Sequence, residues 1–210
     1  MDKRLLLIGG GGHCRSVLDA AKAMDLYDEI GIVDFEDPGI PGVKLVGQDD
    51  DLPRLRKSGW TDAIVTVGSV GSTGLRRKLY GLIKDAGFEI ATVIDPSAAI
   101  AGDTSISEGS FIGKNAVVNT GSKLGFCSII NSGAIVEHDC TVGDFAHLSP
   151  GAVLCGQVSV GDDSHVGAGS VVRQLVNIGK NTMIGMGSVV VSDIPDKVTA
   201  YGNPCKVVKQ

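Results

Sequence analysis

The stretch from Ile130 to Val142, INSGAIVEHDCTV, carries an aliphatic residue at every sixth position, namely Ile130, Val136 and Val142. The same period runs without a slip from Ile94 to Val190. A small or β-branched residue follows each aliphatic residue by four positions, and a glycine often follows it directly. An α-helix repeats at about 3.6 residues and a flat strand at about two, so a strict period of six fits neither.

A period of six is typical of a parallel β-helix built from hexapeptides. Each hexapeptide forms one short strand on one side of a triangular prism, so three hexapeptides make one coil. The aliphatic side chains are expected to stack inside the prism, where only a small residue fits beside them. We therefore predict an all-β domain over residues 94–210, with between five and six coils in the repeat.

Residues 1–93 differ in kind, because apolar strands alternate there with amphipathic helices. Strands are predicted over residues 5–8, 29–34, 63–67 and 89–94, and helices over residues 15–24, 52–58 and 75–86. Such alternation indicates an α/β domain with a small Rossmann-like parallel sheet. The chain is therefore expected to contain two domains, 1–93 and 94–210.

Four glycines, Gly9–Gly12, lie between the first predicted strand and the first predicted helix and are followed by His13. Glycines at this place let the backbone approach a ligand, and a helix N-terminus favours an anion. The dinucleotide fingerprint requires a glycine where this chain has Cys14, so it is not met. A nucleotide site and a tight turn without a ligand both remain open. Asp34 is either a ribose-contacting acid at a strand end or an ordinary turn residue.

The composition argues against several other classes of protein. The net charge of −5 disfavours a nucleic acid as the main partner. No apolar run approaches the roughly 20 residues of a membrane span, and no signal peptide is expected before the first strand. The five cysteines are odd in number and show no paired spacing, so they are interpreted as reduced thiols of a cytoplasmic protein. Cys140 is interpreted as a filler of the core.

His138 is the strongest candidate for chemistry in the repeat. Because Val136 and Cys140 occupy inward positions, the imidazole is expected to point outward near a corner of the prism. Acyl transfer from a thioester requires a base that takes a proton from the attacking amine or hydroxyl, and histidine suits that role. A neighbouring carboxylate, here Asp139, fixes the tautomer of such a ring. Taken alone, these residues also fit a surface histidine in a polar turn.

Several motifs, which together span nearly the whole chain, resemble one known family. They are Ile8–His13, Val33–Phe35, Val67–Gly68, Ile94–Ala98, Asn131–Cys140 and Tyr201–Lys206. The family is the sialic acid O-acetyltransferase family of bacterial sugar acetyltransferases, which have hexapeptide repeats. It includes N-acetyltransferases that act on nucleotide-linked 4-amino sugars of the bacillosamine and perosamine type. This chain departs from the pattern at Cys14, where many relatives carry Gly or Ala, and the departure affects only local packing.

The resemblance implies a left-handed β-helix and an acetyl-CoA-dependent sugar N-acetyltransferase without a metal. It implies that His138 is the general base and that Asp139 is its acidic partner. The residues implied to line the nucleotide-sugar site are Gly11, Gly12, His13, Asp34, Phe35 and Gly68. The residues implied to contact acetyl-CoA are His147, Ala168 and Met186.

The resemblance also implies a homotrimer, with coenzyme A extended between neighbouring subunits and the active sites at their interfaces. The preferred acceptor is the amino group, at C4, of a UDP-linked sugar used for a bacterial surface glycan. Oxygen as the acceptor atom, and GDP or CMP as the carrier, remain open. His147, His165 and Met183 are equally spaced and are expected to stack on one face, with His165 interpreted as a solvated residue.

Three other functions remain open. A sugar O-acetyltransferase of the sialic acid type would use the same residues on a hydroxyl. A noncatalytic nucleotide-sugar-binding trimer would use the repeat only for assembly, which the His138–Asp139 pair disfavours. A zinc hydrolase or carbonic anhydrase on the same β-helix would use three histidines, for which His138, His147 and His165 are the candidates. Their spacing does not match that family, and the α/β domain would be unexplained.

Overall fold

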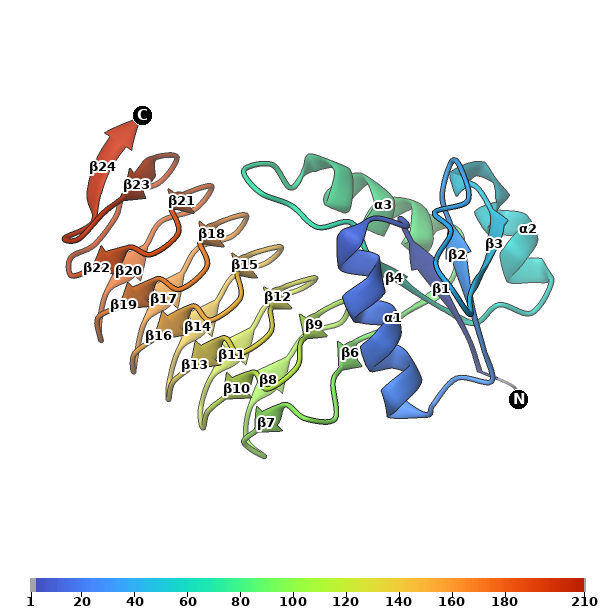
Figure 1. Cartoon of the computed structure of the whole chain (residues 1–210), viewed down its shortest axis with the longest axis horizontal. Coiled ribbons are helices and arrows are strands. Elements are labelled where there is room, and N and C mark those ends of the chain that lie inside the picture. Colours follow the sequence, from blue (N-terminus) through green and yellow to red (C-terminus); the bar gives the residue numbers. More distant parts are fainter. Residues whose placement is uncertain (1–2, 210) are drawn as a thin grey trace. The chain divides into compact units, whose positions relative to one another are not determined.

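The computed structural model describes residues 3–209. The chain divides into two compact units, one formed by residues up to 69 together with 73–96, and the other by 70–72 together with 97 onward. The first unit contains the helices, and the second consists of short stacked strands (Figure 1). Over residues 3–209, no helix has both the length and the apolar character needed to cross a membrane.

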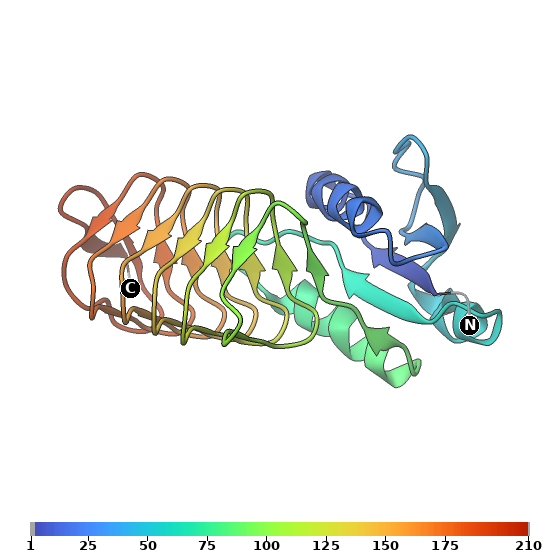
Figure 2. The ribbon, with the colours of Figure 1, turned by 90° about the horizontal axis from the view of Figure 1, so that it is seen from below.

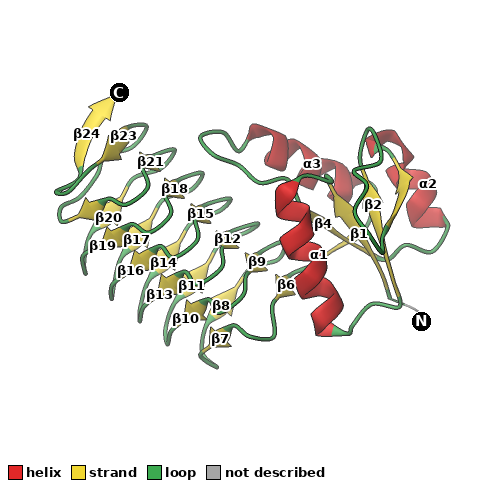
Figure 3. Cartoon of the chain, viewed as in Figure 1, coloured by secondary structure: helices red, strands yellow, loops and turns green. Residues whose placement is uncertain are grey.

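The first unit contains a parallel sheet with the strand order β3-β2-β1-β4-β5. Its strands are β1 (Arg4–Ile8), β2 (Glu29–Val33), β3 (Lys44–Gly47), β4 (Asp62–Val65) and β5 (Glu89–Ile90). The segments between them contain α1 (Gly12–Met24), the 3₁₀ turn η1 (Asp49–Asp51), α2 (Leu52–Lys57) and α3 (Gly74–Asp85) (Figure 3). The strand order switches direction between β1 and β4, and ligands of open α/β sheets bind beyond the carboxyl ends of the strands at such a point.

Three differences between this unit and the sequence prediction are larger than shifts of one or two residues at the end of an element. Strand β3 was not predicted, because Lys44–Gly47 is a short edge strand with only two apolar residues. Helix α1 begins at Gly12, three residues earlier than predicted, because the glycine turn itself forms the first helical turn. The strand predicted over residues 89–94 is two strands, β5 and β6 (Val93–Ile94), since Ala91 and Thr92 interrupt it.

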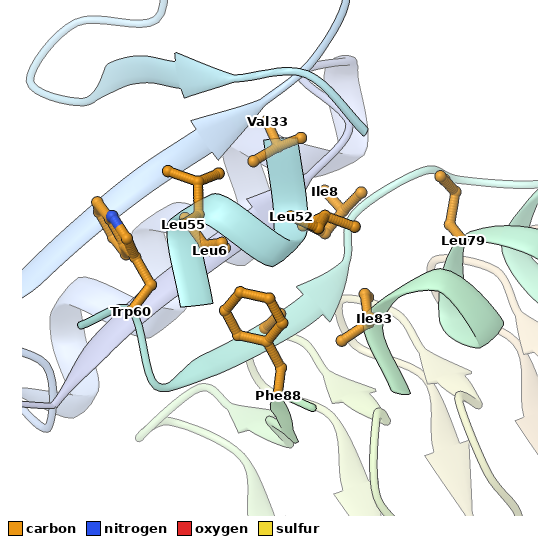
Figure 4. Packing of buried hydrophobic residues seen from close by; sticks show 10 residues of the cluster. Leu6, Ile8, Val33, Leu52, Leu55, Trp60, Leu79, Ile83 and Phe88 are labelled. Carbon is orange, nitrogen blue, oxygen red and sulfur yellow. The ribbon is translucent and has the colours of Figure 1, made fainter. Parts of the chain in front are cut away.

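One part of the core of the first unit lies between the sheet and the helices α2 and α3. Leu6 and Ile8 point to one face of β1, where side chains of α2 and α3 pack against them (Figure 4). The buried cluster comprises Leu6, Ile8, Val33, Leu52, Leu55, Trp60, Ala63, Leu79, Ile83 and Phe88. This packing holds the carboxyl ends of β1 and β4 in place, and the glycine turn follows directly from β1.

The second unit is a left-handed parallel β-helix in which short strands stack coil upon coil (Figure 2). Up to Val190, each strand pairs in parallel with a strand one coil away, as Ile135 does with Val153. The aliphatic residues of the repeat point into the prism and are buried from Ile112 to Val190, as the six-residue period predicts. The final strands, β23 (Thr199–Tyr201) and β24 (Lys206–Lys209), pair antiparallel.

The strands of the second unit form three walls, which we name by the outward-facing residues. The aliphatic wall comprises β7 (Ala99–Ile100), β10 (Val117–Val118), β13 (Ile135–Val136), β16 (Val153–Leu154), β19 (Val171–Val172) and β22 (Val189–Val190). The polar wall comprises β8 (Ser105–Ile106), β11 (Lys123–Leu124), β14 (Thr141–Val142), β17 (Ser159–Val160) and β20 (Asn177–Ile178). The histidine wall comprises β9 (Phe111–Ile112), β12 (Ile129–Ile130), β15 (His147–Leu148), β18 (His165–Val166), β21 (Met183–Ile184), β23 and β24.

Two backbone features recur along the repeat. From Ile106 to Ile184, the third residue after each aliphatic position adopts a left-handed backbone, as Asp139 (φ 58°) and Gln157 (φ 61°) do. The glycine directly after an aliphatic residue is needed for another reason, namely the close approach of the next coil. A Cβ atom on Gly143 would lie 2.6 Å from the backbone nitrogen of Asp162.

Candidate functional site

His138 lies at the corner between the aliphatic wall and the polar wall, between β13 and β14. Its side chain is 52% exposed, whereas Val136 and Cys140 are fully buried, so the ring points outward as predicted. Cys140 fills the core, and its thiol donates to the carbonyl oxygen of Cys155 at 3.2 Å. Burial raises the pKa of this thiol, which therefore stays protonated.

The imidazole of His138 contacts the carboxylate of Asp139. The distance from Nδ1 to Asp139 Oδ2 is 2.9 Å. The left-handed backbone of Asp139, whose N–H donates to the carbonyl of Thr120, lets the carboxylate turn back toward the preceding side chain. Because an ionised carboxylate only accepts hydrogen bonds, Nδ1 carries the hydrogen, and Nε2 keeps the lone pair that can accept a proton.

The backbone around His138 is held by the neighbouring coils. The carbonyl oxygen of His138 accepts the N–H of Gln157, and that of Glu137 accepts the hydroxyl of Ser122 at 2.8 Å. The Glu137 carboxylate accepts a further hydrogen bond from Asn119 at 3.0 Å. These contacts leave the His138 side chain as the movable part of an otherwise fixed corner.

His147 and His165 stack on the histidine wall with Met183, in the predicted register. Their ring centroids lie 4.9 Å apart with an angle of 12° between the planes. The interpretation of His165 as solvated is wrong, because only 9% of the residue is exposed and its Nε2 is 2.6 Å from the hydroxyl of Ser149. Burial lowers the pKa of His165, so this ring is neutral at neutral pH. His147 Nε2 lies 3.3 Å from the amide of Asn131.

Ala168 and Met186 lie on a different corner, between the histidine wall and the aliphatic wall. Both are exposed, Met186 by 81%. His138 lies at the opposite edge of the aliphatic wall. A single chain therefore does not bring the predicted base together with these two predicted coenzyme contacts. Residues 3–209 contain no group of three or more His, Cys, Asp or Glu side chains arranged to hold a metal ion.

The first unit brings the six predicted nucleotide-sugar residues to one cavity of about 460 Å³. They are Gly11, Gly12, His13, Asp34, Phe35 and Gly68. The cavity lies at the carboxyl ends of β1, β2 and β4, next to the N-terminus of α1. Asp49, Leu75 and Leu79 also line it. The sequence alone does not indicate them, because a residue in a helix or turn gives no signal of facing a cavity.

The glycine turn is shaped by Asp34, whose carboxylate accepts the N–H of Gly10 and, at 2.6 Å, that of Phe35. A Cβ atom on Gly11 or Gly12 would meet no other atom within 4 Å, so this part of the turn faces open space. Gly9 differs, because its φ is +104° and a Cβ there would lie 2.5 Å from Val67. Gly9 is therefore needed for the turn, whereas Gly11 and Gly12 leave room beside it.

His13 is a partly buried histidine in the wall of the cavity. Burial, assisted by the nearby Arg76 guanidinium, lowers its pKa to about 4. A Cβ on Gly68 would lie 3.3 Å from the Cβ of His13, so Gly68 lets this side chain pack closely against β4's end. Burial of Asp49, together with Asp34 and Asp50, raises the pKa of the Asp49 carboxyl despite the opposing charge of Lys78.

The lowered pKa of His13 makes stability depend on pH. Its folded pKa is about 4 and its unfolded pKa about 6.5, so the unfolded chain binds a proton that the folded chain rejects. This contribution to stability is present above about pH 6.5 and is lost as the pH falls toward 4. We expect His13 to reduce the free energy of unfolding by about 2 kcal/mol between about pH 7 and about pH 5. Urea unfolding at both pH values checks this, and the pH dependence should be weaker in His13→Gln by the same amount.

The two units of the chain match two different protein-family models. Residues 4–83 match the model described as the PglD N-terminal domain, and residues 139–174 match the bacterial transferase hexapeptide model of six repeats. A sequence search of curated proteins gives no significant match.

Two of the solved structures that resemble nearly the whole chain illustrate the similarity. The acetyltransferase domain of PglB from Neisseria gonorrhoeae FA1090, in complex with acetyl coenzyme A, is 34% identical. The match covers 99% of this chain and 100% of that one, with a TM-score of 0.93. PerB from Caulobacter crescentus, in complex with CoA and GDP-perosamine, is 39% identical. The match covers 97% of this chain and 96% of that one, with a TM-score of 0.91.

Proposed function

Because this chain belongs to the hexapeptide-repeat family of bacterial sugar N-acetyltransferases, we propose that it transfers the acetyl group of acetyl-CoA to the amino group, at C4, of a nucleotide-linked amino sugar. The observation that carries this proposal is the outward His138 held by Asp139 on a β-helix, in a chain that also has an open nucleotide-sized cavity. The product is used for a bacterial surface glycan, and the five cysteines, which are thiols, support a cytoplasmic reaction.

His138 acts as the general base. As the amine attacks the carbonyl carbon of the thioester, a C–N bond forms, and Nε2 of His138 takes the proton from nitrogen. The C–S bond then breaks, and the proton passes from the imidazole to the leaving sulfur, which departs as the thiol of coenzyme A. Asp139 keeps the hydrogen on Nδ1 and stabilises the imidazolium that forms between these two steps.

The cavity of the first unit holds the nucleotide. Its volume of about 460 Å³ lies within the usual range for ligand pockets, roughly 300–1,000 Å³. The N-terminus of α1, at Gly11 and Gly12, offers backbone N–H groups and a favourable dipole to the pyrophosphate. Phe35, which is 77% exposed at the rim, offers a ring face to the nucleobase. UDP is the preferred carrier, while the relative PerB was solved with GDP-perosamine.

The functional unit is a homotrimer with active sites between subunits. The aliphatic wall carries an unbroken outward column of apolar residues, whereas the equivalent column of the polar wall contains Ser, Lys, Thr and Asn. The apolar column consists of Val117, Ile135, Val153, Val171 and Val189. Burying this column against another copy removes it from water and brings the edge carrying His138 near the coenzyme contacts of that copy. His147, Ala168 and Met186 are proposed to supply those contacts.

A substrate screen tests the activity. The enzyme is incubated with acetyl-CoA and a panel of UDP-, GDP- and CMP-linked sugars, each with an amino or a hydroxyl group at the acceptor position, and thiol release is measured. We expect release with a 4-amino sugar on UDP. Release only with hydroxyl acceptors favours the sialic acid type of O-acetyltransferase, and binding without release favours a noncatalytic trimer.

Gly11→Val tests the nucleotide cavity. The backbone of Gly11 (φ −69°, ψ −172°) accepts a side chain, and the space beside it is open, so the variant should fold. Its side chain would occupy the approach to the turn, and we expect the acceptor KM to rise on the order of tenfold or more, with the acetyl-CoA KM unchanged. Gly81→Ala, on an unobstructed part of α3, is the control. An unchanged acceptor KM in folded Gly11→Val would remove the turn from the site.

A further inference from the structure

The ring of His138 lies directly over the backbone of Gly156, one coil further along the β-helix. A Cβ atom on Gly156 would lie 2.4 Å from Nε2, 2.6 Å from Cε1 and 3.0 Å from Cδ2 of that ring. Real Cβ atoms essentially never approach other atoms closer than 3.0 Å. The imidazole therefore occupies the volume that any other residue at position 156 would fill.

The backbone does not require glycine at this position. Gly156 is not among the residues with positive φ, so it does not need the left-handed region that favours glycine. It is the second residue after the aliphatic Leu154, and the same repeat position holds Thr120 one coil before His138 and Gln174 one coil after Gly156. The prism thus accepts side chains at this repeat position, and the glycine at position 156 makes room for the ring of His138.

We propose that Gly156 is a positioning residue for the reaction, because it provides the surface on which the His138 ring rests with Nε2 directed for proton transfer. This inference depends on the proposed role of His138 as the base. The Asp139 side chain packs in the same way against a glycine of the preceding coil, since a Cβ atom on Gly121 would lie 2.5 Å from Asp139 Oδ1. The His138–Asp139 pair lies between these two glycines, and Gly156 is the cleaner test because Gly121 has φ +69°.

A methyl group at position 156 should move the ring and leave the fold intact. To reach ordinary contact distance the ring must shift by about 1 Å, and a misplacement of that size can lower a rate on the order of 10²-fold. The shift should cost little folding free energy, because the ring lies at the end of a side chain that is 52% exposed. The shifted ring also leaves the position in which Nδ1 meets Asp139.

The experiment compares Gly156→Ala with Gly102→Ala. Gly102 occupies the same repeat position two coils before His138, and a Cβ there would meet nothing within 4 Å. We expect Gly156→Ala to lower kcat by on the order of 10²-fold, with the acetyl-CoA KM and the melting temperature near those of the wild type. Gly102→Ala should keep wild-type kcat. Rates are measured with acetyl-CoA and whichever of GDP-perosamine or a UDP-linked 4-amino sugar the wild type acetylates.

A double-mutant cycle separates positioning from a general structural effect. If Gly156 acts through the ring, Gly156→Ala has no further effect on kcat once His138 is alanine. Independently of activity, the ¹⁵N signals of the His138 ring should change in Gly156→Ala and stay unchanged in Gly102→Ala.

Two results overturn the inference, and they differ from failure of the proposed base. Retention of kcat within about twofold in Gly156→Ala, or unaltered ring signals, shows that the ring does not depend on the glycine. An equal loss of kcat in the wild-type and His138→Ala backgrounds shows that Gly156 acts by another route. Full activity of the His138→Ala single variant instead removes His138 as the base, whatever Gly156 does.

Discussion

His138→Ala is expected to turn over about 10²–10⁴ times more slowly than the wild type while it keeps the trimer and the acetyl-CoA affinity. A loss of this size is usual when a general base is removed from the proton transfer that accompanies the attack. In this variant the Asp139 carboxylate also loses the imidazole nitrogen Nδ1, which lies 2.9 Å from its Oδ2 in the wild type. Single-turnover kinetics with acetyl-CoA, together with binding measured by calorimetry, separate the chemical step from coenzyme binding.

Asp139→Asn provides the graded comparison for that variant. The amide keeps the shape of the side chain but can donate a hydrogen bond to Nδ1, which places the hydrogen on Nε2 and removes the lone pair that the reaction needs. We expect a smaller loss of kcat than in His138→Ala, because the ring can still exchange tautomers. A His138→Ala enzyme that retains more than about a tenth of wild-type kcat would show that the proton leaves by another path.

Val153→Asp is expected to dissociate the proposed trimer and to abolish most of the activity with it. Val153 faces outward in the middle of the aliphatic wall, between Ile135 and Val171 of the adjacent coils. A carboxylate at that position must lose its hydration without gaining a partner, which costs several kcal/mol per interface. Because the proposed base and two of the proposed coenzyme contacts lie on opposite edges of this wall, we expect a monomer to lack a complete site.

Ser159→Asp is the matched control, since Ser159 has the same repeat position on the polar wall. It should remain assembled and active, because that wall is already polar. Analytical ultracentrifugation and kcat/KM are measured on both variants, and we expect a fall of about 10²-fold or more for Val153→Asp alone. A Val153→Asp monomer that turns over at the wild-type rate would contradict both the trimer interface and the shared site.

The β-helix can be predicted from the sequence more directly than the α/β unit. Its signal is a period that no other regular structure shares, repeated from Ile94 to Val190, and each aliphatic position from Ile112 onward is buried as that period requires. The α/β unit depends on short, less regular patterns, so the edge strand β3 was missed and the helix ends moved by one to three residues. Edge strands and helix ends are set by neighbouring elements more than by local preference.

The candidate site also has features that the sequence alone predicts and features that only the tertiary structure reveals. The sequence determined by itself that Val136 and Cys140 point inward and that His138 therefore points outward, because the period assigns each residue to a side of the wall. Only the tertiary structure decided that His165 is buried, that Gly156 lies under the His138 ring, and that Ala168 and Met186 lie across the aliphatic wall from that ring. The reason is physical: a period specifies the direction of a side chain, whereas burial and contact depend on what the neighbouring coils and walls place beside it.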